Sequence, residues 1–580
     1  MKTCRQCSAG FEVTREDLVF YDKISPIFHG VKYSIPDPLL CPDCRAQRRT
    51  LHRNEQYMYH NVSLFSQKKL VSIYNPLSPR KIISYAEWFS DTWDAKSFGR
   101  DVDFSRSFFD QFHDILRDVP MASIISLSCE NSEFTTGTGY CKNCYLINCS
   151  EYCENCMYSK LLQNCRDVLD SSYCYDSELL YECLSVRKGY NCAFVSYSHN
   201  CSDCYFCEDC IGCHHCFLST GLRNKSYYFQ DNPLPKEEYF MRVKEFFAHP
   251  MAVAKGKKDL AVLQKNRVHK YANSVNSEKS SGDFILNCQN CVNCFDTNDS
   301  EDCSNVQVGV KCKDVHDCSN MYINPELCYE TLGTIEVNRT HFCLNVYHSQ
   351  DLFYCQHCHS SHDCFGCVGL RNAQYCILNR QYSKEEYEEL VPKIIEHMKQ
   401  TGEWGEFFPP ALSPFGYNET VAQEYFPMTR EEIIEQNKKM DNSGVEPLHA
   451  TALQIQKFNW SDYESPPPTV AKIITKEMMK NLPDDISKIP NDVLSWALTC
   501  EVSGKLFIIQ KPELEFYRKM NLSIPHRHPD IRHADRMKLR NPRKLWKRNC
   551  GNCGTAIETT YSPDRPEKVL CEKCYLDVVS

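Results

Sequence analysis

This 580-residue sequence contains no apolar run near the length of about 20 residues that a helix needs to cross a bilayer. Its opening residues, MKTCRQCSAGFEVTRED, lack the apolar core of a secretory signal. The sequence also lacks a glycine-rich phosphate loop of the Walker or Rossmann type and a nucleophile elbow. These absences predict a soluble, cytoplasmic protein without a membrane partner, and they favour a non-enzymatic role while leaving enzymatic activity open.

Charge of one sign is not in large excess either. The net charge is −9, so the molecule as a whole does not have the basic character of a typical nucleic-acid-binding protein. Basic residues are nevertheless concentrated between Arg518 and Arg548, where they outnumber Asp530 and Asp535. Any strongly positive field is therefore expected to be local. With 42% hydrophobic residues, the chain is long enough for several separate cores.

What the sequence has in abundance is cysteine, with 38 residues, and most of them recur at multiples of three positions. The places three and six residues after each such cysteine hold small or apolar residues, such as Ser159 and Leu162. A second stretch, from Ile285, keeps the same spacing with one slip near Cys328. A fixed period indicates a repeat architecture. The spacing is clearest, at nine residues, in Cys156, Cys165, Cys174, Cys183, Cys192, Cys201 and Cys210.

A three-residue period matches neither the 3.6-residue period of a helix nor the two-residue period of a strand. Short sides joined by tight corners, as in a β-solenoid, place one small residue inward per side, and stacked coils would repeat at roughly 4.8 Å. We therefore predict an α+β multidomain chain with two cysteine-lined, β-solenoid-like arrays. Both arrays end in Gly-Leu-Arg-Asn, at Gly221 and Gly369, followed by Lys-Glu-Glu-Tyr at a helix start, which for the second array is capped by Ser383. The arrays are interpreted as internal duplicates.

Two sets of paired Cys-x-x-Cys motifs have the spacing of closed, structural zinc sites. Four thiolates complete a tetrahedral zinc ion, and thiolates require a reducing compartment, which argues against reading the many cysteines as a secreted disulfide framework. We therefore expect two structural Zn²⁺ ions, and we expect this zinc-ribbon type of module at both ends of the chain. The predicted ligands are Cys4, Cys7, Cys41 and Cys44 at one end and Cys550, Cys553, Cys571 and Cys574 at the other.

Residues around the first zinc set recur in order before the second. Cys4, Phe11 and Tyr21, for example, recur as Cys500, Phe507 and Tyr517. In this second copy three of the four ligand positions have changed, and Cys500 with one histidine cannot close a four-ligand site. The copy is therefore predicted to be degenerate and to have lost its metal. The replacing residues are Ser503, His528 and Ile531.

Arginines spaced four apart in both copies would align on one face of a helix and could grip phosphates in bidentate fashion. The alternative is that they lie on a solvated helix or pair with acidic neighbours such as Asp43 and Asp530. The first interpretation predicts contact with RNA or DNA at both ends of the chain. The predicted contact residues are Arg45, Arg49, Arg53, Arg532, Arg536, Arg540, Arg543, Lys544, Lys547 and Arg548.

Three interpretations of the array cysteines remain open. As small apolar residues they can simply fill a narrow interior. They could instead bind further metal, above all in the dense run from Cys201 to Cys216 with His214 and His215. They could also form disulfide ladders between neighbouring coils.

The predicted domains follow the chain in order. They are an N-terminal zinc module with a basic helix (1–80), an aromatic helical connector (81–128), the first array (129–230), a helical bridge and cap (231–280), the second array (281–382), a helical cap with a Pro- and aromatic-rich segment (383–460), a linker with a short helical unit (461–498), the degenerate module (499–548) and the C-terminal zinc ribbon (549–580).

The motifs FEVTREDLVFY, PLLCPDCRAQRR and TTYSPDRPEKVLCEKCY resemble those of an uncharacterised cysteine-rich zinc-ribbon family of metagenomic bacteria and giant viruses. Members of that family often carry a CaiB/BaiF-like label, which implies a CoA-transferase, but no residue here matches such a catalytic pattern. The sequence thus predicts a zinc-binding scaffold that contacts nucleic acid. The alternatives are a protein-interaction or structural scaffold without such contact, and a metal-storage or redox protein. The sequence specifies neither the partner nor the oligomeric state.

Overall fold

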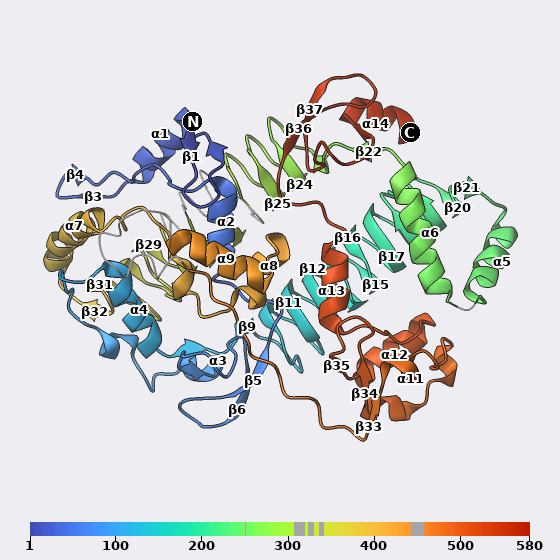
Figure 1. Cartoon of the computed structure of the whole chain (residues 1–580), viewed down its shortest axis with the longest axis horizontal. Helices are drawn as coiled ribbons and strands as arrows, with labels where there is room; N and C mark the ends of the chain where they lie inside the picture. Colours follow the sequence, from blue (N-terminus) through green and yellow to red (C-terminus); the bar gives the residue numbers. More distant parts are fainter. Residues whose placement is uncertain (250, 307–318, 323–329, 336–340, 442–456, 580) are drawn as a thin grey trace.

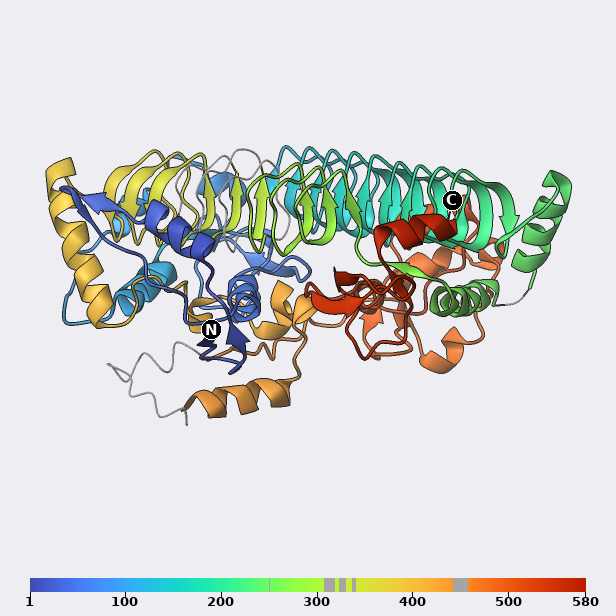
Figure 2. The ribbon, with the colours of Figure 1, turned by 90° about the horizontal axis from the view of Figure 1, so that it is seen from above.

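The computed structural model describes residues 1–249, 251–306, 319–322, 330–335, 341–441 and 457–579 (Figure 1). The predicted array positions Cys312, Cys318 and Cys328 lie outside the described residues. The chain is α+β and multidomain, as predicted, with a group of four cysteines near each end. Figure 2 shows the strands of both arrays in one long row, with α7 (Lys384–Gln400) and α5 (Lys236–Phe247) at opposite ends.

The first array is a sheet of 13 strands in which all but the last strand pair in parallel. The register advances by twelve residues from strand to strand, so that Tyr145 pairs with Met157 and Leu180 with Cys192. The strands are β9 (Ser126–Leu127), β10 (Thr136–Gly139), β11 (Tyr145–Glu151), β12 (Met157–Gln163), β13 (Arg166–Leu169), β14 (Ser172–Tyr175), β15 (Glu178–Tyr181), β16 (Leu184–Arg187), β17 (Tyr190–His199), β18 (Tyr205–Glu208), β19 (His214–Thr220), β20 (Ser226–Phe229) and β21 (Asn232–Pro233).

Two long strands connect different sides of this array. The strand β12 pairs with both β13 and β14, and β17 pairs with both β15 and β16. The pairing therefore closes β12, β13, β15, β17, β16 and β14 into a ring of six parallel strands.

The backbone explains the three-residue period. Every third residue from Ser128 to Gln230, including Gly137, Gly212 and Gly221, has a left-handed conformation, for example Tyr140 and Asn143, both with φ of 54°. This conformation turns the chain sharply, and asparagine and aspartate adopt it more readily than most residues. A corner at every third residue gives four corners in a twelve-residue coil. Corner side chains also bond along the stack: the Asn143 amide donates to Asn155 Oδ1 at 3.3 Å and the Asn155 amide to Asp167 Oδ1 at 3.0 Å.

This geometry predicts that a branched side chain at a corner is destabilising. Asn143→Val should lower the free energy of unfolding by about 1–2 kcal/mol, because the left-handed conformation is strained for such a residue. Asn143→Gly removes the same amide but accepts the conformation, so it should have the smaller effect. Chemical denaturation of both variants measures the difference. Equal losses of unfolding free energy in the two variants would show that the side-chain hydrogen bond of Asn143, and not the corner conformation, determines the stability.

The residue after each corner points inward, as the spacing predicted. Cys156 and Cys174 have no exposed surface. The Cys156 thiol donates to the Glu154 carbonyl at 3.3 Å and to the Cys165 carbonyl of the next coil at 3.6 Å. The described cysteines form no disulfides with one another. The array thiols thus act as small interior donors, which agrees with the packing interpretation and not with disulfide ladders.

The second array repeats the parallel pairing. Gly282 pairs with Cys294 at a twelve-residue step, whereas Ser319 pairs with Leu332 at a step of thirteen, which confirms the slip expected near Cys328. Its strands, with the entering β22, are β22 (His269–Lys270), β23 (Ser274–Val275), β24 (Gly282–Leu286), β25 (Cys294–Asn298), β26 (Ser319–Tyr322), β27 (Leu332–Ile335), β28 (Leu344–Tyr347), β29 (Gln350–Phe353), β30 (His362–Phe365), β31 (Gln374–Ile377) and β32 (Arg380–Gln381).

Helices cover the ends and one side of the arrays. Ser383 caps α7 through a capping box, as predicted. The connector helix begins at Phe108 with Ser107 as its cap. The helical elements of these segments are α3 (Tyr85–Trp88), η1 (Ala95–Phe98), α4 (Phe108–Asp118), α5, α6 (Ala252–Asn266), α7, η2 (Pro410–Leu412), η3 (Tyr417–Glu419), α8 (Val421–Tyr425) and α9 (Arg430–Asp441).

The N-terminal module and its degenerate copy share one order of elements, a hairpin followed by two helices, whereas the C-terminal ribbon has a hairpin followed by one helix. The N-terminal elements are β1 (Lys2–Thr3), β2 (Gly10–Phe11), α1 (Arg15–Ile24), β3 (Ile27–Phe28), β4 (Val31–Lys32), α2 (Pro42–Thr50), β5 (Tyr59–Val62) and β6 (Lys69–Ser72), followed by β7 (Ile82–Ile83) and β8 (Met121–Ala122). The C-terminal elements are β33 (Lys472–Ile474), α11 (Lys476–Met479), η4 (Ile486–Lys488), η5 (Asn491–Ser495), β34 (Trp496–Thr499), β35 (Leu506–Phe507), α12 (Lys511–Met520), α13 (Pro529–Met537), β36 (Trp546–Asn549), β37 (Ala556–Thr559), β38 (Val569–Leu570) and α14 (Glu572–Val579).

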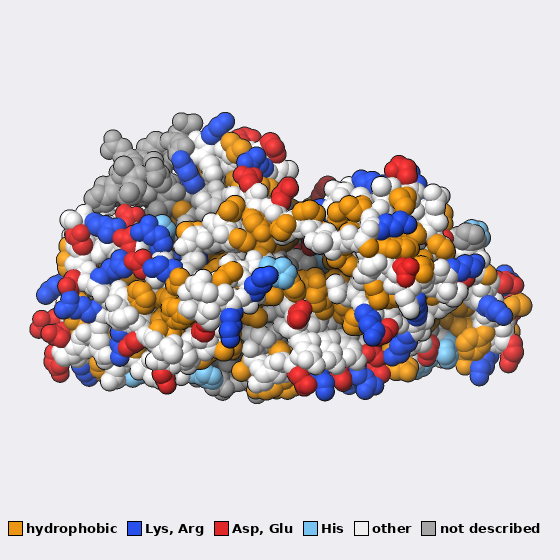
Figure 3. Space-filling model, turned by 90° about the horizontal axis from the view of Figure 1, so that it is seen from below, with side chains coloured by type: hydrophobic (Ala, Val, Ile, Leu, Met, Phe, Trp, Pro, Cys, Tyr) orange, Lys and Arg blue, Asp and Glu red, His pale blue; other side chains and the backbone are white. Residues whose placement is uncertain are grey.

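The two arrays touch near the middle of the molecule. The Tyr197 and Phe284 rings stack with centroids 5.4 Å apart, and Arg187 donates to Asn298 at 3.3 Å. The terminal modules lie on one side of the row of strands and form two lobes with a notch between them (Figures 2 and 3). No helix within the described ranges has both the length and the apolar character needed to cross a membrane.

Candidate metal centres and arginine clamps

Four cysteine sulfurs meet in the N-terminal module, as predicted. The Sγ atoms of Cys4, Cys7, Cys41 and Cys44 all lie within 4.8 Å of one another. The first two come from the β1–β2 hairpin, and the other two from the start of α2, where Cys41 is the N-cap residue. The Cys41 backbone N–H donates to Cys4 Sγ at 3.3 Å. These four sulfurs form a compact group that could hold a metal ion.

The C-terminal group has the same geometry. Cys550, Cys553, Cys571 and Cys574 also have their Sγ atoms within 4.8 Å of one another. The Cys571 N–H donates to Cys550 Sγ at 3.2 Å, the counterpart of the contact from Cys41 to Cys4. The Sγ–Sγ distance between Cys7 and Cys41 is 3.7 Å, and the distance between Cys553 and Cys571 is the same. The two ends therefore use one design, a knuckle hairpin followed by a helix.

In each group the surroundings favour the thiolate form of one cysteine, whereas the pKa values of Cys44 and Cys571 are raised. The hydrogen-bonded thiol of Cys44 lowers the pKa of Cys41 to about 5. Burial raises the pKa of Cys550, but the backbone N–H groups of Cys571, Cys553 and Asn552 lower it more, to about 6. Thiolates are the form that binds metal. Four thiolates in this arrangement fit a structural Zn²⁺ ion with no open position.

The degenerate module keeps the shape of these centres. The Cys500 N–H donates to the Lys505 carbonyl at 2.9 Å, and the Gly504 N–H to the Cys500 carbonyl at 3.0 Å, as in the knuckle around Cys550. His528 occupies the N-cap position of α13, and its Nδ1 accepts the Asp530 N–H at 3.1 Å. The histidine thus caps the helix where the other modules place a cysteine ligand.

The predicted arginines lie on α2 and α13 or just beyond them, but most are not on the surface. In the N-terminal module Arg49 is fully buried and Arg45 is 4% exposed. The Arg45 guanidinium donates to the Leu40 carbonyl at 2.8 Å, and Arg53 donates to Cys149 Sγ at 3.1 Å. Their neighbour Arg48 donates to Glu330 at 2.9 Å and to Glu406 at 2.6 Å. This helix packs into the protein with its arginines inside.

In the degenerate module the arginines clamp onto the arrays. Arg532 and Arg536 both bind Asp170, a fully buried corner residue of the first array, with Arg536 at 3.1 Å. Arg536 also donates to the Tyr158 carbonyl at 3.0 Å. The two guanidinium groups share the Asp170 carboxylate, and Arg532 also lies 3.5 Å from the buried Glu513.

A second clamp joins both arrays. Arg540 and Arg543 bind Asp296 of the second array, with Arg543 at 2.7 Å. The Arg540 guanidinium also lies over the ring of Tyr173 in the first array, 3.9 Å from its centroid. One pair of arginines therefore holds the two arrays together.

This burial contradicts the expectation of an exposed arginine stripe at Arg45, Arg49, Arg532, Arg536, Arg540 and Arg543. A buried, paired guanidinium cannot reach a phosphate unless the module opens. Lys547 is exposed and Lys544 is 53% exposed, with its ammonium 3.8 Å from Asp43. Arg548 is half-buried and donates to two carbonyls, those of Ser562 and Glu567, at 3.2 Å. Among the residues predicted to contact nucleic acid, the accessible ones are Lys544 and Lys547.

A buried ion cluster lies between the N-terminal module, α8 and the first array. The Lys160 ammonium is 2.7 Å from Glu55 and 2.6 Å from Glu424. Arg53 pairs with Glu55, and His533 lies 3.7 Å from Glu424. Apart from Arg53, the sequence analysis did not single out these residues, nor Asp170 and Asp296. No local pattern marks them, because their partners are distant in the chain.

The ion cluster predicts acid sensitivity. Burial raises the pKa of Glu55, but Arg53 and Lys160 lower it more, to about 2. Because this pKa lies below the unfolded value of about 4.3, the carboxylate stabilises the fold fully above pH 4.3, and this contribution is lost as the pH falls toward 2. The unfolding temperatures of wild type and Glu55→Gln should differ most near pH 7 and converge as the pH falls to about 2. A difference that stays constant from pH 7 to pH 3 would contradict this assignment.

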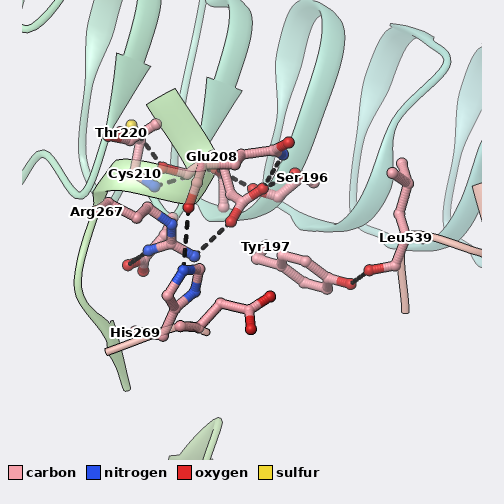
Figure 4. A network of polar contacts seen from close by, with 12 residues as sticks. Ser196, Tyr197, Glu208, Cys210, Thr220, Arg267, His269 and Leu539 are labelled. Atoms are coloured by element: carbon pink, nitrogen blue, oxygen red, sulfur yellow. Dashed lines mark hydrogen bonds and ion pairs between the residues drawn. The ribbon is translucent and has the colours of Figure 1, made fainter. Parts of the chain in front are cut away.

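The C-terminal ribbon docks onto the first array through a second polar network. The Tyr575 hydroxyl and Arg267 both bind Asp209, with Arg267 at 2.9 Å. Arg267 also pairs with Glu208, and Figure 4 shows these two side chains pointing toward one another above His269. The strand β38 pairs with β22, which leads into the second array. The ribbon thus connects the start of the second array with the far half of the first.

The dense cysteine run does not combine with its histidines. His214 Nδ1 lies 2.7 Å from the Ser202 hydroxyl on the outer surface, and the His215 ring stacks on Tyr227 with centroids 5.2 Å apart. Cys201 and Cys213 point into the interior and are at most 1% exposed. Among the described residues, ligand atoms gather in the two terminal groups alone, so the predicted further metal in the arrays has no matching cluster there.

No protein-family model matches the chain, and no match is found among curated proteins.

Proposed function

We propose that the protein is a zinc-binding scaffold in which two β-solenoid arrays are held by zinc-organised terminal modules. Several observations support the solenoid. The strands pair in parallel at twelve-residue steps, the corners recur every third residue, and the inward residues are small and buried. The closed ring of six strands is compatible with this proposal, because β12 and β17 each run along two sides of a coil. The proposal also includes the domain boundaries predicted from the sequence.

The observation that carries the proposal is that the arginines of the degenerate module bind carboxylates of the two arrays. Arg532 and Arg536 meet at Asp170, and Arg540 and Arg543 meet at Asp296. Buried charge pairs contribute to specificity of arrangement more than to net stability. Basic residues that could have bound phosphate are thus committed to fixing the arrays in one relative position. Such a fixed, elongated body suits the assembly of other proteins along its length.

An exposed row of corners on the first array offers a surface for a protein partner. Tyr140 and Tyr152, at equivalent corners of successive coils, are 50% and 54% exposed and stack with centroids 5.0 Å apart. Tyrosine is enriched where proteins bind one another. Beside them Arg166 and Glu178 form a surface ion pair at 2.6 Å. We include the resemblance to the cysteine-rich zinc-ribbon family in this proposal, without a CoA-transferase activity.

Binding to nucleic acid is the rival function, and a salt titration separates the two. Zinc-loaded protein is mixed with RNA and with DNA at two salt concentrations. The scaffold proposal predicts no more than weak binding that Lys544→Ala with Lys547→Ala removes, because few phosphate contacts are available. A log-log slope of several units, at roughly 0.7–0.9 per phosphate contact, would instead establish a true nucleic-acid interface.

A second test addresses the scaffold itself. Small-angle scattering of the zinc-loaded protein should give an elongated particle, and chelation should increase its radius of gyration as the modules release the arrays. The matched variants Asp296→Asn and Asp299→Asn compare a buried clamp carboxylate with an exposed corner carboxylate. An unchanged particle after chelation and in both variants would contradict the proposal.

A further inference from the structure

We propose that Cys553 and Cys571 form an oxidisable pair in the C-terminal centre, so that hydrogen peroxide expels its zinc while the N-terminal centre keeps its own. The inference rests on the proposed zinc binding and assigns a modification site within it. Its basis is the contrast between two centres that are alike in geometry and unlike in exposure.

The geometry of both centres permits a disulfide with little movement. The Sγ atoms of Cys553 and Cys571 lie 3.7 Å apart, as do those of Cys7 and Cys41. Reaction with a small oxidant also requires access to the sulfurs, since oxidation follows thiolate character and exposure. The Sγ–Sγ distances therefore do not distinguish the two centres. The access of a small oxidant to the sulfurs does.

Access differs at the second sulfur of each pair. Cys7 and Cys553 are both exposed. Cys41 is buried, with 7% of its surface exposed, whereas Cys571 is only partly buried. The inward array cysteines, such as Cys156 and Cys207, have no exposed surface and are shielded from oxidants. The pair of Cys553 and Cys571 is therefore the most accessible pair of neighbouring sulfurs among the described cysteines.

The reaction balances with a hydroperoxide as oxidant. The thiolates of Cys553 and Cys571 lose two electrons and form one S–S bond. The electrons break the O–O bond of hydrogen peroxide, which takes two protons from solvent and leaves as two water molecules. The two cysteines no longer supply thiolates, so Zn²⁺ is released to solvent. A thiol reductant reverses the step and restores the ligands.

The location of the pair connects this chemistry to the arrangement of the arrays. Cys571 directly follows β38, which pairs with β22, and Glu572 lies 2.8 Å from Lys270. Tyr575, one residue after the ligand Cys574, binds Asp209 of the first array. Loss of zinc should therefore loosen the ribbon from both arrays and leave the N-terminal module in place.

The test uses the full-length protein loaded with zinc and treated with hydrogen peroxide. Released zinc is followed with a chromophoric chelator, and differential alkylation with mass spectrometry identifies the oxidised cysteines. We expect one zinc to leave roughly ten times faster than the other, together with a disulfide between Cys553 and Cys571 that a thiol reductant reverses. Oxidation of Cys7 and Cys41 first, or of array cysteines first, would overturn the proposal.

Matched ligand variants keep the result interpretable. Cys7→Ser empties the N-terminal centre, so the one remaining zinc ion should leave in the fast phase. Cys553→Ser empties the C-terminal centre, so the one remaining zinc ion should leave in the slow phase. Hydrogen exchange of α14 and β22 should rise on oxidation in wild type, while that of α2 stays unchanged. A zinc content other than two ions per chain before peroxide is added would contradict the proposed function itself. Two zinc ions released at equal rates would contradict only the assignment of Cys553 and Cys571 as the oxidisable pair.

Discussion

Asp170→Asn should destabilise the contact between α13 and the first array by about 3–5 kcal/mol, because it leaves the buried Arg536 without a carboxylate and Arg532 with only Glu513, at 3.5 Å. Asp170 has no exposed surface, and it is bound by both Arg532 and Arg536. Asparagine has the same shape and accepts the left-handed corner, where Asp170 has φ of 50°. The substitution therefore changes the charge and little else. Native-state hydrogen exchange of the α13 amides measures the effect.

The control is Asp176→Asn. Asp176 also occupies a left-handed corner of the first array, with φ of 50°, but it is exposed, and it accepts a hydrogen bond from Asn164. Surface substitutions of this kind usually change stability by no more than about 0.5 kcal/mol. Equal effects at the two positions would mean that Asp170 does not hold the module in place.

Cys44→Ala should abolish the N-terminal metal centre and unfold much of its module. Structural zinc sites contribute apparent binding energies of about 10–16 kcal/mol at pH 7, and three ligands do not close such a site. The bound zinc should fall from two ions to one, and α2 should lose its protection from hydrogen exchange. Because Arg48 and Arg49 sit on α2, contacts to Glu330 should weaken as well.

A cysteine outside the centres provides the comparison. Cys129→Ala alters a partly exposed thiol in the first coil of the array, far from either group of four. This variant should retain two zinc ions and a protected α2. If Cys44→Ala retained both ions, or if Cys129→Ala lost one, the assignment of ligands would be wrong.

The parts of the fold that sequence spacing predicted are those set by local rules. Cys-x-x-Cys spacing located both groups of four cysteines, because four thiolates near one ion need two knuckles and little else. The three-residue period located the inward positions, because each corner turns the chain after three residues. It did not predict the twelve-residue coil, since any multiple of three has the same local pattern. The recurrence of Asn131, Asn143, Asn155 and Asp167 at steps of twelve was a signal that could have set it.

The contacts between the arginines and the array carboxylates could not be predicted from local sequence patterns. Four-residue spacing correctly placed Arg532 and Arg536 on one helix face. Whether that face meets solvent or carboxylates depends on Asp170, which lies 362 residues from Arg532 in sequence. A basic helix has the same pattern in either case. Long-range packing decided the role of these residues, and it turned a predicted phosphate-binding surface into an internal contact.

The most direct test of this account is the number of zinc ions bound by the purified protein under reducing conditions, measured by mass spectrometry of the metal. Two closed centres and a metal-free interior of the arrays predict two ions per chain, one of them lost in Cys44→Ala and the other in Cys574→Ala. No bound zinc, or many more than two ions retained in both variants, would contradict the account and favour a metal-storing array.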